Sequence, residues 1–69
     1  MRAEIVKGCF KDLINNGYSY NDAAQMTITL ELVAETLFLK LGIENPSDEH
    51  SSEVIACLSA VMQKGKEFA

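Results

Sequence analysis

The chain has 69 residues, of which 48% are hydrophobic, and ten acidic against six basic side chains give it a formal net charge of −4. This length allows one domain at most, and the hydrophobic share excludes a disordered chain. The charge has the wrong sign for phosphate backbones, so we expect no nucleic-acid partner. No apolar run reaches the roughly 18 residues of a membrane-spanning helix, so we expect no membrane partner. A chain this short has a small core, which makes self-association a usual route to stability.

The first predicted helix covers residues 3–16. Its apolar side chains recur at intervals that place them on one side of a helix. They are Ile5, Val6, Cys9, Phe10, Leu13 and Ile14. Asn15 and Asn16 precede Gly17, which is placed for the left-handed conformation that follows a helix C-terminus.

The second predicted helix, residues 20–41, carries apolar residues on two sides. Ser19 is placed as its N-cap, in a capping box with Asp22, and Gly42 ends it. At about 100° per residue, seven residues form a broad stripe. They are Ala23, Met26, Leu30, Val33, Ala34, Leu37 and Leu41. A narrower stripe lies roughly opposite and consists of Ile28, Leu32 and Leu39. Because an ordinary surface helix buries one stripe, this helix should be covered from two sides.

Residues 26–32 also fit a β-strand, because apolar and polar side chains alternate strictly along them. We favour a helix, since no turn residue interrupts residues 21–41 and a lone strand would have no partner to pair with. A β-containing fold stays open as the alternative.

The third predicted helix covers residues 46–66. Asn45 followed by Pro46 has the form of an N-cap and first helical residue, although Ser47 or Asp48 fits the cap position as well. One face carries Val54, Ile55, Leu58, Val61 and Met62. We expect fraying near Gly65, which leaves Phe68 either packed on the core or free.

Two short connections favour antiparallel neighbours, so the predicted fold is all-α. It is a small up-down-up three-helix bundle with a long middle helix, a single domain over residues 1–69 that packs into a helical homo-oligomer.

Few residues carry reactive chemistry. Cys9 and Cys57 lie in apolar patterns, which predicts two buried thiols, with a disulfide between the first and last helices as the alternative. His50 is the only histidine, and no CxxC or phosphate-binding glycine motif occurs. We therefore expect no catalytic residue, no metal site and no cofactor. Residues 1–7 do not resemble a signal peptide, which favours a cytoplasmic protein.

Two surfaces are predicted to bind other molecules. One is the narrow stripe of Ile28, Leu32 and Leu39, because exposed apolar patches usually mark interaction sites. The other is the turn with Tyr18, Tyr20 and Asn21, because tyrosine offers a large contact area with few rotatable bonds.

We therefore expect a non-enzymatic adaptor, regulator or inhibitor whose partners are a second copy of itself and another protein. Two alternatives stay open. Skewed packing of the other helices covers the narrow stripe, or an oligomer forms pockets between subunits that bind a small ligand or nucleotide. Such pockets would be lined by Tyr18, Tyr20, Thr27 and Thr29.

Residues 10–23 resemble the opening of a ubiquitin-associated domain in their pattern of Phe10, Leu13 and Gly17 to Ser19, followed by Asp22 and Ala23. The second helix of that family is short, whereas the one expected here continues to residue 41. No ubiquitin-binding residue is therefore assigned. In size, acidity and helical content the chain is similar to small phage or mobile-element proteins that inhibit or adapt host machinery.

Overall fold

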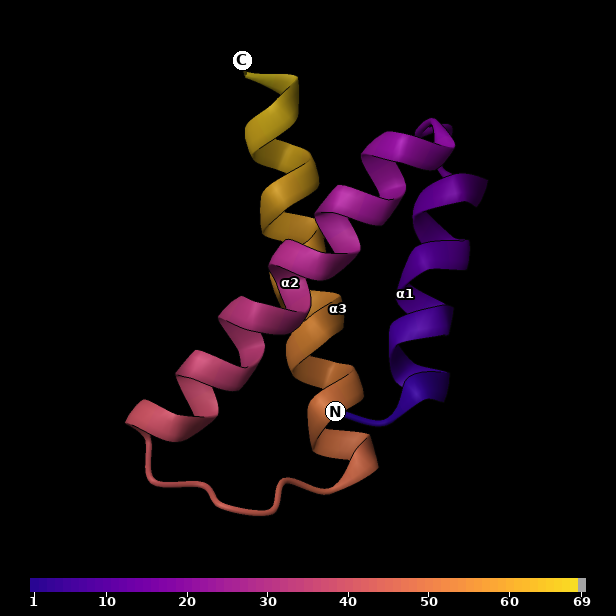
Figure 1. Cartoon of the computed structure of the whole chain (residues 1–69). Helices are drawn as coiled ribbons and strands as arrows, with labels where there is room; N and C mark the ends of the chain where they lie inside the picture. The colour runs from indigo at the N-terminus through magenta and orange to yellow at the C-terminus, as the bar shows by residue number, and fades with distance from the viewer. Residues whose placement is uncertain (69) are drawn as a thin grey trace.

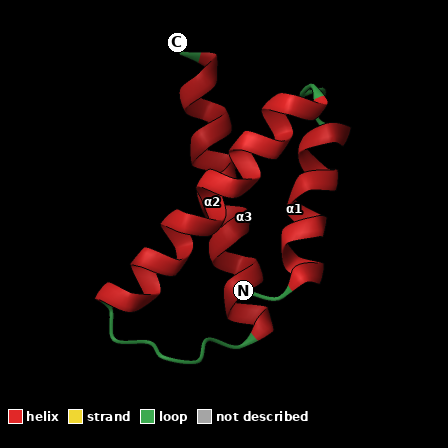
Figure 2. Cartoon of the chain, in the orientation of Figure 1, coloured by secondary structure: helices red, strands yellow, loops and turns green. Residues whose placement is uncertain are grey.

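The computed structural model describes residues 1–68, which form three α-helices: α1 (Ala3–Asn15), α2 (Tyr20–Lys40) and α3 (Asp48–Glu67). The helices run up, down and up in chain order, and α2 crosses α3 diagonally (Figure 1). Residues 1–68 contain no strand, so the alternation over residues 26–32 is helical and the β alternative is wrong (Figure 2). The molecule measures 33 × 25 × 16 Å.

Serine side chains begin the second and third helices. The Asp22 backbone N–H donates to Ser19 Oγ at 3.1 Å, which confirms Ser19 as the N-cap of α2. The His50 N–H donates to Ser47 Oγ at 3.0 Å. The cap of α3 is therefore Ser47, and the expectation of a helix starting at Pro46 is wrong by two residues. A serine hydroxyl satisfies one of the free N–H groups at a helix start, and here it fixes where α3 begins.

Left-handed glycines end the first two helices. Gly17 has a φ of 97°, as predicted, and Gly42 has a φ of 73°. The Ile43 N–H then donates to the Phe38 carbonyl at 2.9 Å, a bond that closes the last turn of α2. The third helix does not fray at the fourth glycine, since α3 continues to Glu67. Phe68 is 82% exposed, so it is not packed on the core.

The core is small and is built mainly by α1 and α2. Its buried apolar residues are Cys9, Leu13, Ala23, Met26, Leu30, Ala34, Phe38 and Ile55. Four members of the predicted broad stripe are thus buried. The other three are exposed, and the expectation for them is wrong: Val33, Leu37 and Leu41. Phe38 and Thr27 are buried instead, and neither belonged to a predicted stripe.

The oblique crossing of α2 over α3 explains this exchange. From Met26 to Phe38 the buried residues follow a row spaced by four, and each step of four residues turns the contact by about 40° around the helix. Packing along such rows is the usual way for helices to cross obliquely. By the end of α2 the contact has moved toward Phe38 and away from Leu41.

The outer helices bury less than their patterns predict. In α1 only Cys9 and Leu13 are buried, and the other stripe residues are half-buried or exposed. In α3 the buried apolar residue is Ile55. Val61, expected in the same face, is exposed because it lies about 240° around the helix from Ile55.

Candidate protein-interaction site

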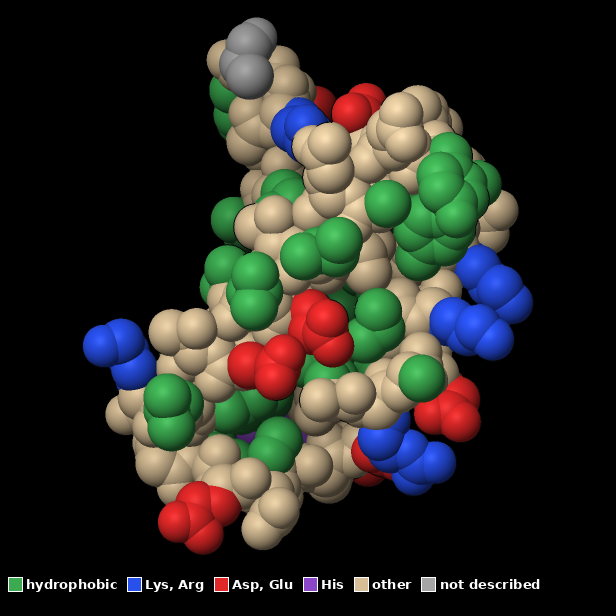
Figure 3. All heavy atoms as spheres, viewed as in Figure 1, with side chains coloured by type: hydrophobic (Ala, Val, Ile, Leu, Met, Phe, Trp, Pro, Cys, Tyr) green, Lys and Arg blue, Asp and Glu red, His purple; other side chains and the backbone are tan. Residues whose placement is uncertain are grey.

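The outer side of α2 carries three aliphatic side chains that no other helix covers. Ile28 is 58% exposed, Leu32 is 61% exposed and Leu39 is 79% exposed. The alternative that skewed packing covers this stripe within the bundle is therefore wrong. We call these three residues the outer stripe. Figure 3 shows the molecule with α2 in front, and separate groups of hydrophobic side chains lie on this face around two acidic side chains at its centre.

The outer stripe continues around α2 on one side. A shallow hollow of about 340 Å³ is lined by Leu32, Val33, Thr36, Leu37 and Lys40. Val33 and Leu37 were expected in the core, and their exposure joins them to Leu32 instead. On the other side lie Glu31, which is half-buried, and Glu35, which is exposed. This arrangement provides apolar contact with a charged border and no group that performs chemistry.

The tyrosine-containing turn divides into a packed part and an accessible part. Tyr18 packs against the core, and its backbone N–H donates to the Leu13 carbonyl at 3.2 Å. Tyr20 is exposed, and its ring meets the Phe10 ring edge to face at 5.1 Å between centroids. Asn21 is exposed. Tyr20 and Asn21 are therefore available for binding, whereas Tyr18 stabilises the joint between α1 and α2.

The turn and the outer stripe are not one surface. Seven residues separate Asn21 from Ile28, which is a rise of about 10 Å along α2, and Leu39 lies a further 16 Å or so along it. The structure therefore separates the six predicted interaction residues into a group at the start of α2 and a group over its later turns.

The four residues suggested for a small-ligand pocket do not form one within a single chain. The Thr27 hydroxyl is buried and donates to the Ala23 carbonyl at 2.7 Å. Across residues 1–68, the cavities are lined by neither tyrosine, and Thr27 and Thr29 are also missing from their walls.

The two thiols lie in different environments. Cys9 is buried and Cys57 is exposed, and both are free, so the disulfide alternative is wrong and the burial expected for Cys57 is wrong as well. Burial raises the pKa of the Cys9 thiol, a hydrogen bond with the Thr27 side chain opposes this, and the nearby Asp12 carboxylate raises the pKa further. Cys9 is therefore held in the neutral form, which is a poor nucleophile.

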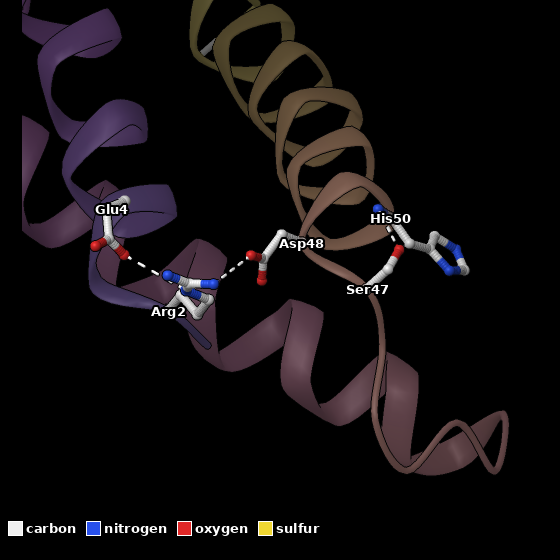
Figure 4. A network of polar contacts seen from close by, with 5 residues as sticks. All are labelled: Arg2, Glu4, Ser47, Asp48 and His50. Atoms are coloured by element: carbon white, nitrogen blue, oxygen red, sulfur yellow. Dashed lines mark hydrogen bonds and ion pairs between the residues drawn. The ribbon is translucent and has the colours of Figure 1, made fainter.

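Polar contacts at the lower end of the bundle join the chain's start to α3. Arg2 Nη1 lies 2.7 Å from Asp48 Oδ2, and Arg2 Nε lies 3.6 Å from Glu4 Oε2 (Figure 4). The His50 side chain points away from this network and meets the Phe38 ring edge to face at 5.4 Å. Within residues 1–68, no three His, Cys, Asp or Glu side chains are grouped so that they could hold a metal ion.

Sequence reasoning did not identify Phe38 as a residue that organises this end of the bundle. It is buried, contacts His50, and accepts the hydrogen bond that ends α2. The only signal was its size, because its position falls between the two predicted stripes.

The helices of residues 1–68 lack the combination of length and apolar character that crossing a bilayer requires. Comparison of the chain with protein-family models, with curated proteins and with solved structures found no match.

Proposed function

We propose that this chain is a non-enzymatic protein that works by protein–protein interaction, and that the outer stripe of α2 binds a second copy of the chain. The observation that carries the proposal is the exposure of Ile28, Leu32 and Leu39, at 58–79%, on the longest helix of a small domain. Apolar side chains grouped in this way gain free energy when another surface removes them from water, at about 25 cal/mol per Å².

The size of the molecule supports a second copy as the occupant. A standard interface buries about 800 Å² on each partner. The accessible surface of the chain is 4902 Å², and one broad face of a molecule 33 × 25 × 16 Å provides an area of that order. A chain with so small a core gains proportionally more from such an interface than a large domain does.

The spacing of the stripe supports an antiparallel pair of α2 helices. Leu32 and Leu39 are equally distant in sequence from the midpoint between Glu35 and Thr36. A twofold axis at that midpoint brings Leu32 of one copy against Leu39 of the other, twice. Isologous contacts of this kind are the commonest way in which identical subunits associate.

The experiment is light scattering coupled to size exclusion over a wide concentration range. We expect the wild-type chain to form a dimer. The double variant Ile28→Glu, Leu39→Glu should be monomeric with unchanged helix content, because it places two charges in the interface and changes no core residue.

The matched control is the double variant Val61→Glu, Phe68→Glu. It adds the same charge at side chains that are similarly exposed, at 66% and 82%, on α3. It should dimerise like the wild type. A monomeric wild type, or loss of association in the α3 variant but not in the α2 variant, would contradict the proposal.

A further inference from the structure

A second concave surface lies apart from the shallow hollow on α2. A groove of about 540 Å³ opens between the last turns of α2, the connection that follows and the start of α3. Its apolar lining consists of Met1, Phe38, Leu39, Ile43 and Pro46. This volume lies within the roughly 300–1,000 Å³ of small-molecule sites, which combine an apolar lining with a few polar groups.

Three polar side chains of this groove lack a partner. Ser51 is only 5% exposed and lines the groove, yet its hydroxyl takes part in none of the side-chain hydrogen bonds found in residues 1–68. The carboxylates of Glu35 and Glu44 also line the groove, and the ion pairs of residues 1–68 involve neither of them. A buried hydroxyl without a partner is costly, so a ligand that hydrogen-bonds to Ser51 gains by satisfying it.

The charge of the lining selects the ligand class. Two carboxylates face the groove, and among its described lining residues there is no Lys, Arg or His. An anionic ligand would meet repulsion there and find no charged donor. An ammonium group carries a positive charge and three N–H donors, so it can serve a carboxylate and a hydroxyl together.

We propose that this groove binds a small organic cation, namely a primary ammonium group on a compact apolar body. The ammonium lies between Ser51 and the carboxylate of Glu35, and the apolar body packs against Phe38 and Ile43. Glu44 adds negative charge at the rim. The site goes beyond the proposed function, because every group that it uses belongs to one chain.

Benzylamine is the probe, titrated into the ¹⁵N-labelled full chain at neutral pH and followed by amide chemical shifts. We expect saturable shifts centred on Gly42, Ile43 and Ser51. Benzyl alcohol has the same ring without the charge, and it should bind at least about fivefold more weakly, as should benzoate, because a charged hydrogen bond is worth about that much in a partly open site.

Matched variants locate the charge. Glu35→Gln should weaken benzylamine binding about fivefold, since it removes a surface-type charge interaction. Glu31→Gln makes the same change one turn earlier on α2, at a residue outside the groove, and should leave the affinity within about twofold. Ser51→Ala should weaken binding by a factor similar to that of Glu35→Gln, because it removes a hydrogen bond to a charged group.

Three results would overturn this site: no saturable shifts, equal binding of benzylamine and benzyl alcohol, or equal effects of the two glutamate variants. Ile28→Glu separates this test from that of the proposed function, because it disturbs the outer stripe and none of the groove residues. It should titrate like the wild type. Binding that disappears in Ile28→Glu would assign the cation site to the dimer interface and refute a site within one chain.

Discussion

The inner and outer sides of α2 have similar apolar side chains and very different surroundings. Leu30 is 1% exposed on the inner side, whereas Leu32, two residues later, is 61% exposed on the outer side. The inner residues stabilise the fold of a single chain. The outer residues contribute almost nothing to that fold, because contact with α1 and α3 covers only one side of α2. Their apolar surface becomes useful only when a second molecule covers it.

The largest effect is expected from truncating the two sides separately. Leu30→Ala should lower the free energy of unfolding by about 2–5 kcal/mol, because it leaves a cavity in the core. Leu32→Ala should change it by less than about 0.5 kcal/mol. Urea denaturation followed by circular dichroism, at a concentration where the chain is monomeric, measures both. Equal effects would contradict the assignment of inner and outer sides.

The two thiols extend the comparison to another residue type. Cys57 should react with a thiol reagent as fast as an unstructured thiol, and Cys9 at least about tenfold more slowly, because the buried group requires local opening. The raised pKa of Cys9 slows it further by lowering the fraction of thiolate. Absorbance of the released reagent follows both phases. The variant Cys57→Ser should lose the fast phase only, and a single phase in the wild type would argue against the packing of Cys9.

A smaller effect is expected from the N-cap of α2, which supports both sides equally. Ser19→Ala removes the acceptor of the Asp22 N–H and should lower the free energy of unfolding by about 1 kcal/mol. The dimer affinity of the folded chain should stay unchanged, because the outer stripe is intact. Thermal unfolding and sedimentation give the two quantities. A loss of association without a loss of stability would mean that the turn at Tyr20 and Asn21 is part of the interface.

The smallest effect is expected at the ion pair between Arg2 and Asp48. Both side chains are more than half exposed, so Asp48→Asn should cost about 0.2–1 kcal/mol of stability and less in high salt. Denaturation at two salt concentrations tests this. A larger loss would show that the start of the chain is a necessary part of the fold rather than a surface contact.

The local parts of the fold could be predicted from the sequence because their causes are local. Ser19 lies before an uninterrupted helical run, and Gly17 follows the asparagines that end α1. A cap or a left-handed glycine acts over only a few residues, and those residues are visible in the sequence. The start of α3 was less certain because three neighbouring residues suited the cap, and the hydrogen bond to Ser47 decides among them.

The inner face of α2 could be predicted only in part. Periodicity places residues around a helix, but the angle at which α2 crosses α3 depends on contacts between distant segments. Phe38 and Leu41 therefore exchanged their expected roles. The outer stripe was visible in the sequence because Ile28, Leu32 and Leu39 share a side, and the structure shows that α1 and α3 leave that side open. The groove beside Ser51 had no sequence signal, because its lining comes from α2, α3 and the connection between them.

The central claim is that the outer stripe binds a second copy, and isotope-filtered nuclear Overhauser measurements test it most directly. The sample mixes ¹³C-labelled and unlabelled chains, so that only contacts between copies are detected. The account predicts contacts between the methyl groups of Leu32 in one copy and Leu39 in the other, together with contacts from Ile28. Contacts confined to Val61 and Phe68, or none in a sample at the highest attainable concentration, would contradict it.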